Sequence, residues 1–440
     1  MSGLIGLGAL VAAGLLSAVL PQATLARASH VIVISIDGLG PDAYLTQPPP
    51  TLGAVMARGS HARRLVSVFP SLTYPAHASM ATGAWPSEHG VASNYDDAGG
   101  FLSRADDMQA KPLWEAVGEA GLVTAIVTWP LSVGAKVDYR VPEILDFAHG
   151  VTKGQLRQAS TPSLARWLDD KAMASDLPPF SHPEAGLRYD SMTEALAGKI
   201  IREKKPNLLF LHFLDYDHRQ HLHGPDSREA DAALRRIDQR VGALLAAAKA
   251  AGTLADTAIL ILGDHGFTPV HSALSLPSLM ALEASDEGDE SAGYKTIFAR
   301  ASVAFYGARL EGLEARFRAL AQRRFNGLFE VLSPDRLAET NGFPGAAFAL
   351  VAQQGYVFTE SKTRAAVVPA LPFRGAHGYL PDSPAMAAGL LVAGPGIKQG
   401  VVLPVVRMVD IAPTIAAMLG VCFPTPSGQV IAGLFDEPVC

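Results

Sequence analysis

Short apolar runs alternate with amphipathic stretches along most of the chain. The runs at 30–36, 207–213, 257–262 and 388–393 are rich in Leu, Ile and Val, as expected for strands that a parallel sheet buries on both faces. Stretches with helical spacing separate them, most clearly the long amphipathic segment that Asp226-Ser227 precedes. This alternation predicts an α/β fold with a parallel sheet and right-handed crossovers.

Two segments lose this periodicity and collect Pro, Gly and Asp. We interpret residues 130–188 as an insertion over the edge of the sheet where the strands end. Residues 268–370 are a second insertion, which could form a second lobe. A chain of 440 residues exceeds the size at which one core usually suffices, so we expect one large domain over 29–440 with these insertions, or two lobes.

Composition narrows the classes of partner. The apolar fraction of 49% is ample for a folded core, and the net charge of -6 is mild for this length. No basic stripe occurs in the sequence. We therefore expect no nucleic-acid binding.

The N-terminus predicts export. Leu4 to Leu20 is an uncharged apolar run followed by Pro21 and small residues, a signal-peptide pattern over residues 1–28 that lacks only a Lys or Arg before the run. The alternative is an uncleaved membrane anchor, although the run is at the short limit for a span; otherwise no stable membrane insertion is expected. A periplasmic or secreted location would be oxidising, so Cys422 and Cys440 could form one tail disulfide, or remain two buried thiols.

One threonine lies at a predicted junction between a strand and a helix. Residues 65–69 read as extended, and Pro75 fits the first turn of a helix over 76–82 that stops at Gly83. Thr73 precedes this turn, where backbone N–H groups favour a phosphate-like anion. Its hydroxyl is either a helix cap or a nucleophile, and the local pattern alone favours the cap.

Asp and His side chains follow the ends of several predicted strands. The carboxyl ends of parallel strands are where open α/β sheets bind ligands. Three Asp and three His supply the oxygen and nitrogen ligands that zinc prefers, enough for two ions about 4 Å apart. These residues are Asp37, Asp217, His221, Asp264, His265 and His377. His218 and His223 share a segment with His221 and compete with it, whereas His212 inside a strand is better explained as a hydrogen-bonded core residue.

The motifs together resemble the nucleotide pyrophosphatase/phosphodiesterase family of the alkaline phosphatase superfamily. The resemblance extends from residue 31 to about 420, in that family's motif order. It implies an alkaline-phosphatase-like, mostly parallel sheet with helices on both faces and inserted cap segments. The matching motifs are Asp37-Gly, Thr73-Tyr-Pro-x-His, Thr82-Gly83, Glu88-His89-Gly90, Asp217-x-x-x-His221-x-x-Gly-Pro, Gly-Asp264-His265-Gly and Ala-His377-Gly-Tyr.

The resemblance also implies roles for individual residues. One zinc ion would be held by Asp37, Asp264, His265 and the Thr73 oxygen, and the other by Asp217, His221 and His377. Thr73 would be the nucleophile, because zinc coordination favours its alkoxide without a histidine base. Asn94 would donate to a non-bridging phosphate oxygen.

The chain departs from the family pattern at two positions. Tyr74 stands where relatives often carry Phe, and its ring either stacks on a substrate base or aryl group or packs under the loop. Ala76 replaces a frequent Asn, which bears on fine specificity and not on metal binding. We assign His77 and His89 to structure.

The sequence therefore predicts an exported two-zinc phosphodiesterase or nucleotide pyrophosphatase that acts on a small phosphoester or nucleotide. The alternatives are a phosphomonoesterase or phosphonate hydrolase on the same metal core, with Arg374 as the candidate extra cation, and a zinc-stabilised binding protein without catalysis. The sulfatase branch is disfavoured because Thr73 is no cysteine.

Overall fold

The computed structural model describes residues 27–171, 173, 175–282 and 293–436. Its largest sheet has nine strands in the order β17-β2-β16-β6-β1-β5-β3-β4, with β18 paired to β2. Strand β16 is antiparallel to its neighbours β2 and β6, and the other pairs are parallel. The strands are β1 (His30–Ile36), β2 (Ser60–Val66), β3 (Thr124–Val127), β4 (Tyr139–Val141), β5 (Leu208–Phe213), β6 (Thr257–Leu262), β16 (Ala388–Ala393), β17 (Val402–Leu403) and β18 (Val406–Arg407). The predicted mostly parallel sheet is confirmed.

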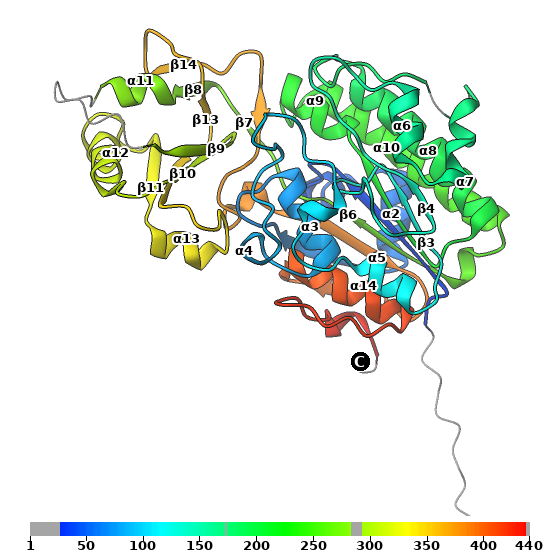
Figure 1. The fold of residues 1–440 in the computed structure, drawn as a ribbon. Coiled ribbons are helices and arrows are strands. Elements are labelled where there is room, and N and C mark those ends of the chain that lie inside the picture. The colour runs from blue at the N-terminus through cyan, green and yellow to red at the C-terminus, as the bar shows by residue number, and fades with distance from the viewer. Residues whose placement is uncertain (1–26, 172, 174, 283–292, 437–440) are drawn as a thin grey trace, which may run out of the picture.

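Helices cover both faces of this sheet (Figure 1). Side chains alternate along β1: Val31 and Val33 pack in one apolar cluster with α5 (Leu113–Glu119) and α14 (Ile411–Leu419). Ile32 and Ile34 pack in a second cluster with α8 (Ala185–Lys204) and α10 (Arg228–Ala250). A strand buried on both faces must be apolar at every position, which explains the continuous run.

Several predicted elements match the structure and one does not. Strands β1, β6 and β16 have the predicted bounds, and Ser227 caps α10 by accepting a hydrogen bond from Ala230 N. The extended stretch predicted over 65–69 is correct at its start and wrong at its end, because β2 covers Ser60–Val66 and stops there. The chain then turns for six residues before α3 (Thr73–Thr82) begins.

Residues 268–376 form three small sheets beside the main one. An antiparallel sheet has the order β11-β12-β10-β9, a second has β13-β8-β14, and β15 pairs with β7. Their apolar side chains make a separate core around Phe305, Phe317 and Phe348. Figure 1 shows this lobe to the left of the main sheet. Its elements are β7 (Thr268–Pro269), β8 (Ser272–Ser275), α11 (Leu276–Ala281), β9 (Lys295–Ala299), β10 (Ser302–Tyr306), α12 (Glu311–Arg323), β11 (Phe329–Leu332), α13 (Pro334–Thr340), β12 (Phe348–Ala352), β13 (Tyr356–Thr359), β14 (Val367–Pro369) and β15 (Gly375–Ala376).

Residues 130–188 lie at the edge of the main sheet that β4 forms. Within them, β4 extends the sheet by pairing with β3, so this segment is partly sheet. The helices α6 (Lys153–Ala159) and α7 (Pro162–Ala165) follow. The remaining helices of the main domain are α1 (Asp42–Leu45), α2 (Pro50–Ala57), α4 (Pro86–His89) and α9 (Asp215–His223).

The two ends of the chain carry predictions that the described residues test only in part. Residues 1–26, nearly all of the predicted signal peptide, lie outside them. Cys422 is disulfide-bonded. Its predicted partner, Cys440, lies outside the described residues. In the part of the chain that the structure describes, no helix has the length and apolar character needed to cross a membrane.

Candidate functional site

The six predicted metal ligands converge at one edge of the main sheet. Strand β1 lies between β5 and β6, so the residues that follow these three parallel strands meet there. All six side chains are buried. They are Asp37 after β1, Asp217 and His221 on α9 after β5, Asp264 and His265 after β6, and His377 after β15.

The first group of ligand atoms surrounds Asp217. His221 Nε2 lies 3.5 Å from Asp217 Oδ2, His377 Nε2 lies 3.8 Å from Asp217 Oδ1, and the two Nε2 atoms are 3.2 Å apart. Each histidine donates its Nδ1–H to a backbone carbonyl, His221 to Gly375 and His377 to Ser71. Burial holds the pKa of both rings well below 6.5, so both are neutral. Two facing Nε2 lone pairs beside a carboxylate are a donor set that could hold a cation.

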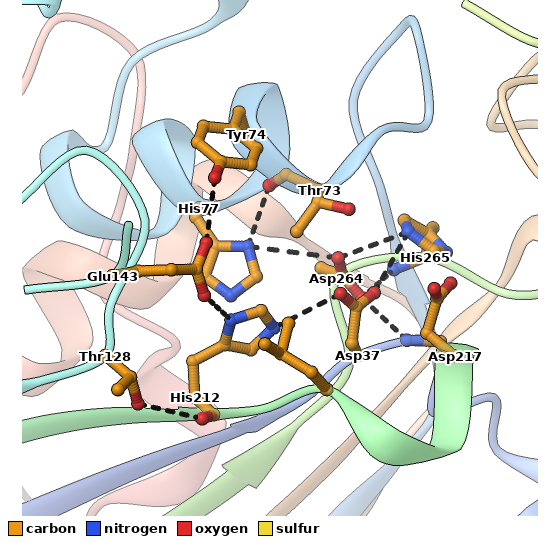
Figure 2. A network of polar contacts seen from close by, with 12 residues as sticks. Asp37, Thr73, Tyr74, His77, Thr128, Glu143, His212, Asp217, Asp264 and His265 are labelled. Atoms are coloured by element: carbon orange, nitrogen blue, oxygen red, sulfur yellow. Dashed lines mark hydrogen bonds and ion pairs between the residues drawn. The ribbon is translucent and has the colours of Figure 1, made fainter. Parts of the chain in front are cut away.

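The second group contains Asp37, Asp217 and His265, whose ligand atoms lie within 4.8 Å of one another. His265 Nε2 is 3.4 Å from Asp37 Oδ1 and 3.2 Å from Asp264 Oδ2. The other Asp264 oxygen accepts hydrogen bonds from Gly38 N and His265 N. The network is drawn in Figure 2.

Two properties of these residues suit them to hold a metal ion: buried polar atoms without hydrogen-bond partners, and several carboxylates close together. Asp37 Oδ1, Asp217 Oδ1, Asp264 Oδ2 and His265 Nε2 are buried and have no hydrogen-bond partner among the described residues. Burial raises the pKa of Asp217 to about 8, and the negative charge of Asp264 adds to the effect. Burial likewise raises the pKa of Asp37, with Asp217 and Asp264 contributing. A cation between these groups offsets both costs.

The structure brings together the residues of each predicted ligand set, and their binding of metal stays a prediction. Asp217, His221 and His377 lie together, and Asp37 and Asp264 both lie against His265. However, Asp217 belongs to both groups, because its carboxylate also lies near Asp37 and His265. His218 and His223 are in neither group. His218 stacks on Phe180 instead.

Thr73 lines the same cavity as Asp37 and Asp217. It is the first residue of α3, and the N-cap position is taken by Leu72. The cap interpretation of Thr73 is therefore wrong: its hydroxyl makes no capping bond, because the extended backbone just before the helix belongs to Leu72. The Thr73 carbonyl accepts a hydrogen bond from His77 Nδ1. The hydroxyl is thus left for chemistry at the positive end of a helix.

Asn94 and Tyr74 lie beside Thr73 with different environments. The Asn94 side-chain oxygen accepts a hydrogen bond of 3.0 Å from Tyr74 N, which leaves the amide NH₂ to donate into the cavity. Tyr74 is only 1% exposed, and its ring stacks on Phe101. It therefore offers a substrate little surface, and the exposed rings of the cavity are Tyr95 and Phe147.

Sequence reasoning missed Glu143 and the link from Glu143 through His212 to Asp37, although it correctly predicted His212 as a buried, hydrogen-bonded histidine. His212 lies 2.8 Å from Glu143 through Nδ1 and 3.4 Å from Asp37 through Nε2. Burial lowers the pKa of His212, but the carboxylates of Glu143 and Asp37 outweigh it and raise the pKa well above 6.5. His212 is therefore a charged link to Asp37 and more than a core histidine. The sequence did contain a signal for this link: His212 is an ionisable side chain in a strand buried on both faces, and such a side chain requires a polar partner.

The cavity has a volume of about 1040 Å³. Four of the six predicted ligands line it, together with residues of the loop at 93–101 and of the 268–376 lobe; these four are Asp37, Asp217, His221 and His377. Arg300 and Lys295 of the lobe line it, whereas Arg374 does not. Arg374 is exposed to solvent, so it is not the cation of the site.

The chain is similar to proteins described as phosphodiesterases and pyrophosphatases. A Schizosaccharomyces pombe protein described as an uncharacterized pyrophosphatase/phosphodiesterase is 26% identical over 55% of this chain and 45% of its own length. A Xenopus laevis bis(5'-adenosyl)-triphosphatase is 21% identical over 93% of this chain and 81% of its own. The chain spans less than half the length of several other curated relatives it matches.

The fold also has solved counterparts. Murine ectonucleotide pyrophosphatase/phosphodiesterase 5 superposes with a TM-score of 0.66 at 20% identity, covering 91% of this chain and 97% of that one. The same murine protein is known as an inactive threonine-to-alanine variant in complex with AMP. The family described as type I phosphodiesterase/nucleotide pyrophosphatase matches residues 31–380. The chain belongs to this type I phosphodiesterase/nucleotide pyrophosphatase family.

Proposed function

We propose that this protein is an exported, two-zinc phosphodiesterase or nucleotide pyrophosphatase that uses Thr73 as its nucleophile. The observation that carries the proposal is that the two ligand groups share Asp217, and that Asp217 lines the same cavity as Thr73, whose hydroxyl does not cap the helix. The first zinc would be held by Asp37, Asp264 and His265 with the Thr73 oxygen, and the second by Asp217, His221 and His377. The substrate is a small phosphoester or nucleotide.

When bound, the two ions would favour the Thr73 alkoxide and stabilise the negative charge of the leaving oxygen. The Thr73 oxygen loses its proton to solvent and forms a bond to phosphorus while the bond to the leaving oxygen breaks, giving a phospho-threonine ester; the leaving oxygen takes up a proton. Water then attacks the phosphorus, the bond between phosphorus and the Thr73 oxygen breaks, and a proton of the water returns to Thr73, which releases the phosphomonoester product. The Asn94 amide and the backbone N–H of Thr73 donate to the non-bridging oxygens, where charge develops. The next N–H groups of α3 are not free, because Tyr74 N donates to Asn94 and Ala76 N donates to Leu72 O.

Export is supported by the disulfide at Cys422, since disulfides persist in oxidising compartments. N-terminal sequencing of protein from the periplasmic or culture fraction tests it. Cleavage near Ala28 agrees with a signal peptide. An intact N-terminus in a membrane fraction would support the anchor alternative.

The test of the activity compares two chromogenic substrates. The zinc-loaded protein should hydrolyse the p-nitrophenyl ester of thymidine 5′-phosphate faster than p-nitrophenyl phosphate. The reverse order would favour the phosphomonoesterase alternative, for which Arg300 at the cavity is now the candidate cation. Hydrolysis of a phosphonate ester alone would indicate the phosphonate hydrolase. Bound zinc without turnover of any phosphoester would support the remaining alternative, a zinc-stabilised binding protein without catalysis.

A further inference from the structure

Arg300 lies in the turn between β9 and β10 and lines the cavity of the candidate site. Ala299 pairs with Ser302, so Arg300 is the first residue of a two-residue hairpin turn, with φ +58°. A hairpin turn of this kind needs positive φ, which costs an arginine conformational energy. Glycine, which adopts positive φ without this cost, would be expected at position 300 unless the arginine side chain has a function.

The turn is fixed against the loop that carries His377. Ser302 Oγ donates a hydrogen bond of 2.9 Å to Gly378 O. A Cβ atom on Gly378 would lie 2.0 Å from Ala299 O, so only glycine permits this approach. The Arg300 carbonyl accepts a hydrogen bond of 2.8 Å from Phe358 N. The hairpin and the ligand loop therefore hold Arg300 at a fixed place relative to His377.

The Arg300 side chain is preorganised and forms no ion pair within the described part of the chain. Its guanidinium carbon lies 4.2 Å from the centre of the Phe373 ring, so the ring supports one face of the cation. Among the described residues, no carboxylate lies within ion-pair distance of it, although the residue is half-buried. By contrast, the neighbouring Lys295 is already paired with Asp97. Arg300 is thus a partly desolvated cation that lines the cavity and forms no ion pair with any described residue.

Arg300 is also on the side of the second ligand group. The Phe373 ring that supports its guanidinium lies 5.8 Å from the His221 ring, centre to centre. Arg300, His221 and His377 line the same cavity. The aromatic rings Tyr95, Phe101 and Phe147 line another part of the cavity. The cavity therefore offers an aromatic wall for a base and one cation near the group that would stabilise the leaving oxygen.

We propose that Arg300 is a subsite for a phosphate group within the leaving group of the substrate. The inference rests on the proposed function and narrows it to phosphoanhydrides, such as nucleoside triphosphates and dinucleoside polyphosphates. A guanidinium binds a phosphate through two parallel N–H···O bonds, and this bond pattern requires an anion that a neutral aryl leaving group lacks. Arg300 then selects the leaving group and takes no part in the bond-making step.

The experiment compares Arg300→Gln with the wild type on two substrates that differ in the leaving group. With ATP, whose leaving group is pyrophosphate, kcat/KM should fall about 10- to 100-fold, as expected for loss of charged hydrogen bonds. With the p-nitrophenyl ester of thymidine 5′-phosphate, kcat/KM should not change. Arg300→Lys should recover part of the activity on ATP. Arg364→Ala, which removes an exposed cation of the same lobe outside the cavity, is the matched control and should match the wild type on both substrates.

An equal loss on both substrates, or no loss on ATP, would overturn the proposed subsite. If the wild type hydrolyses neither substrate, the proposed function itself has failed. A second measurement then tests the subsite without any turnover. Calorimetry measures pyrophosphate binding to zinc-loaded Thr73→Ala with and without Arg300→Gln. Weaker binding to the double variant supports the subsite even without turnover, and equal binding refutes it.

Discussion

His212 Nδ1 lies 2.8 Å from Glu143 Oε2, and both side chains are fully buried. The other Glu143 oxygen accepts a hydrogen bond of 2.9 Å from the Tyr74 hydroxyl (Figure 2). Through His212, Glu143 reaches Asp37, whose carboxylate is 3.4 Å from His212 Nε2. A residue outside the ligand groups thus orients one of the predicted ligands, as carboxylates behind metal-bound groups commonly do.

Glu143→Gln should weaken zinc binding about 10-fold or more, because the charge that holds His212 against Asp37 is removed. Competition with a chromogenic chelator measures the zinc affinity. Tyr74→Phe is the matched control, since it removes one hydrogen bond of Glu143 and keeps the charge. Equal zinc affinity in Glu143→Gln and the wild type would contradict this role.

Thr73→Ala should reduce turnover about 10³-fold or more and leave zinc content near two ions per chain, because six side-chain ligands remain. Elemental analysis of the purified variant gives the metal content. Thr73→Ser, which keeps a hydroxyl, should retain activity. Full activity of Thr73→Ala would exclude the phospho-threonine mechanism.

Asp217→Asn should lower the content of both metal ions, because the Asp217 carboxylate belongs to both ligand groups. His377→Ala should lower that of only one, since His377 belongs to a single group. Metal content after dialysis against a weak chelator distinguishes them. Equal stoichiometry in the two variants would show that Asp217 serves one ion only. Treatment of the wild type with a strong chelator should abolish turnover, and zinc should restore it.

Asp190 should make the metal-free protein less stable as the pH rises. Burial raises its pKa from 3.8 to about 7 in the folded state, despite hydrogen bonds from Leu214 N and Asp215 N. The folded state therefore binds this proton more tightly than the unfolded state does, and the resulting stability is lost as the pH rises through about 7. Denaturant titrations at pH 5 and pH 8 should show the wild type losing unfolding free energy relative to Asp190→Asn. A constant difference between the two proteins would disprove the raised pKa.

Gly378→Ala should destabilise the contact between the 268–376 lobe and the His377 loop. The added Cβ would meet Ala299 O at 2.0 Å, and φ at Gly378 is +91°. Overpacking of this kind costs about 1–3 kcal/mol of unfolding free energy. Gly312→Ala is the control, because a Cβ atom added at Gly312, on the exposed start of α12, would meet no heavy atom within 4 Å. Equal unfolding free energies of Gly378→Ala and the wild type would argue against a fixed hairpin.

The sequence alone determined the central strands of the main sheet and the positions of the predicted ligands at their ends. Apolar runs such as 30–36 and 257–262 match β1 and β6 to the residue, because a strand buried on both faces must be apolar throughout. Asp37 and Asp264 directly follow these runs, and adjacent parallel strands bring their ends together. Local periodicity was sufficient for these conclusions.

Tertiary structure decided the contacts between residues that are distant in sequence. Glu143 is 69 residues from both Tyr74 and His212, and it lies in a segment without periodicity, so no local pattern could pair them. Likewise, Arg300 reaches the cavity only because the hairpin of the second lobe packs on Gly378. The pattern of apolar residues along the chain indicates which face of a helix or strand is buried. The packing of these elements against one another decides which polar side chains come into contact.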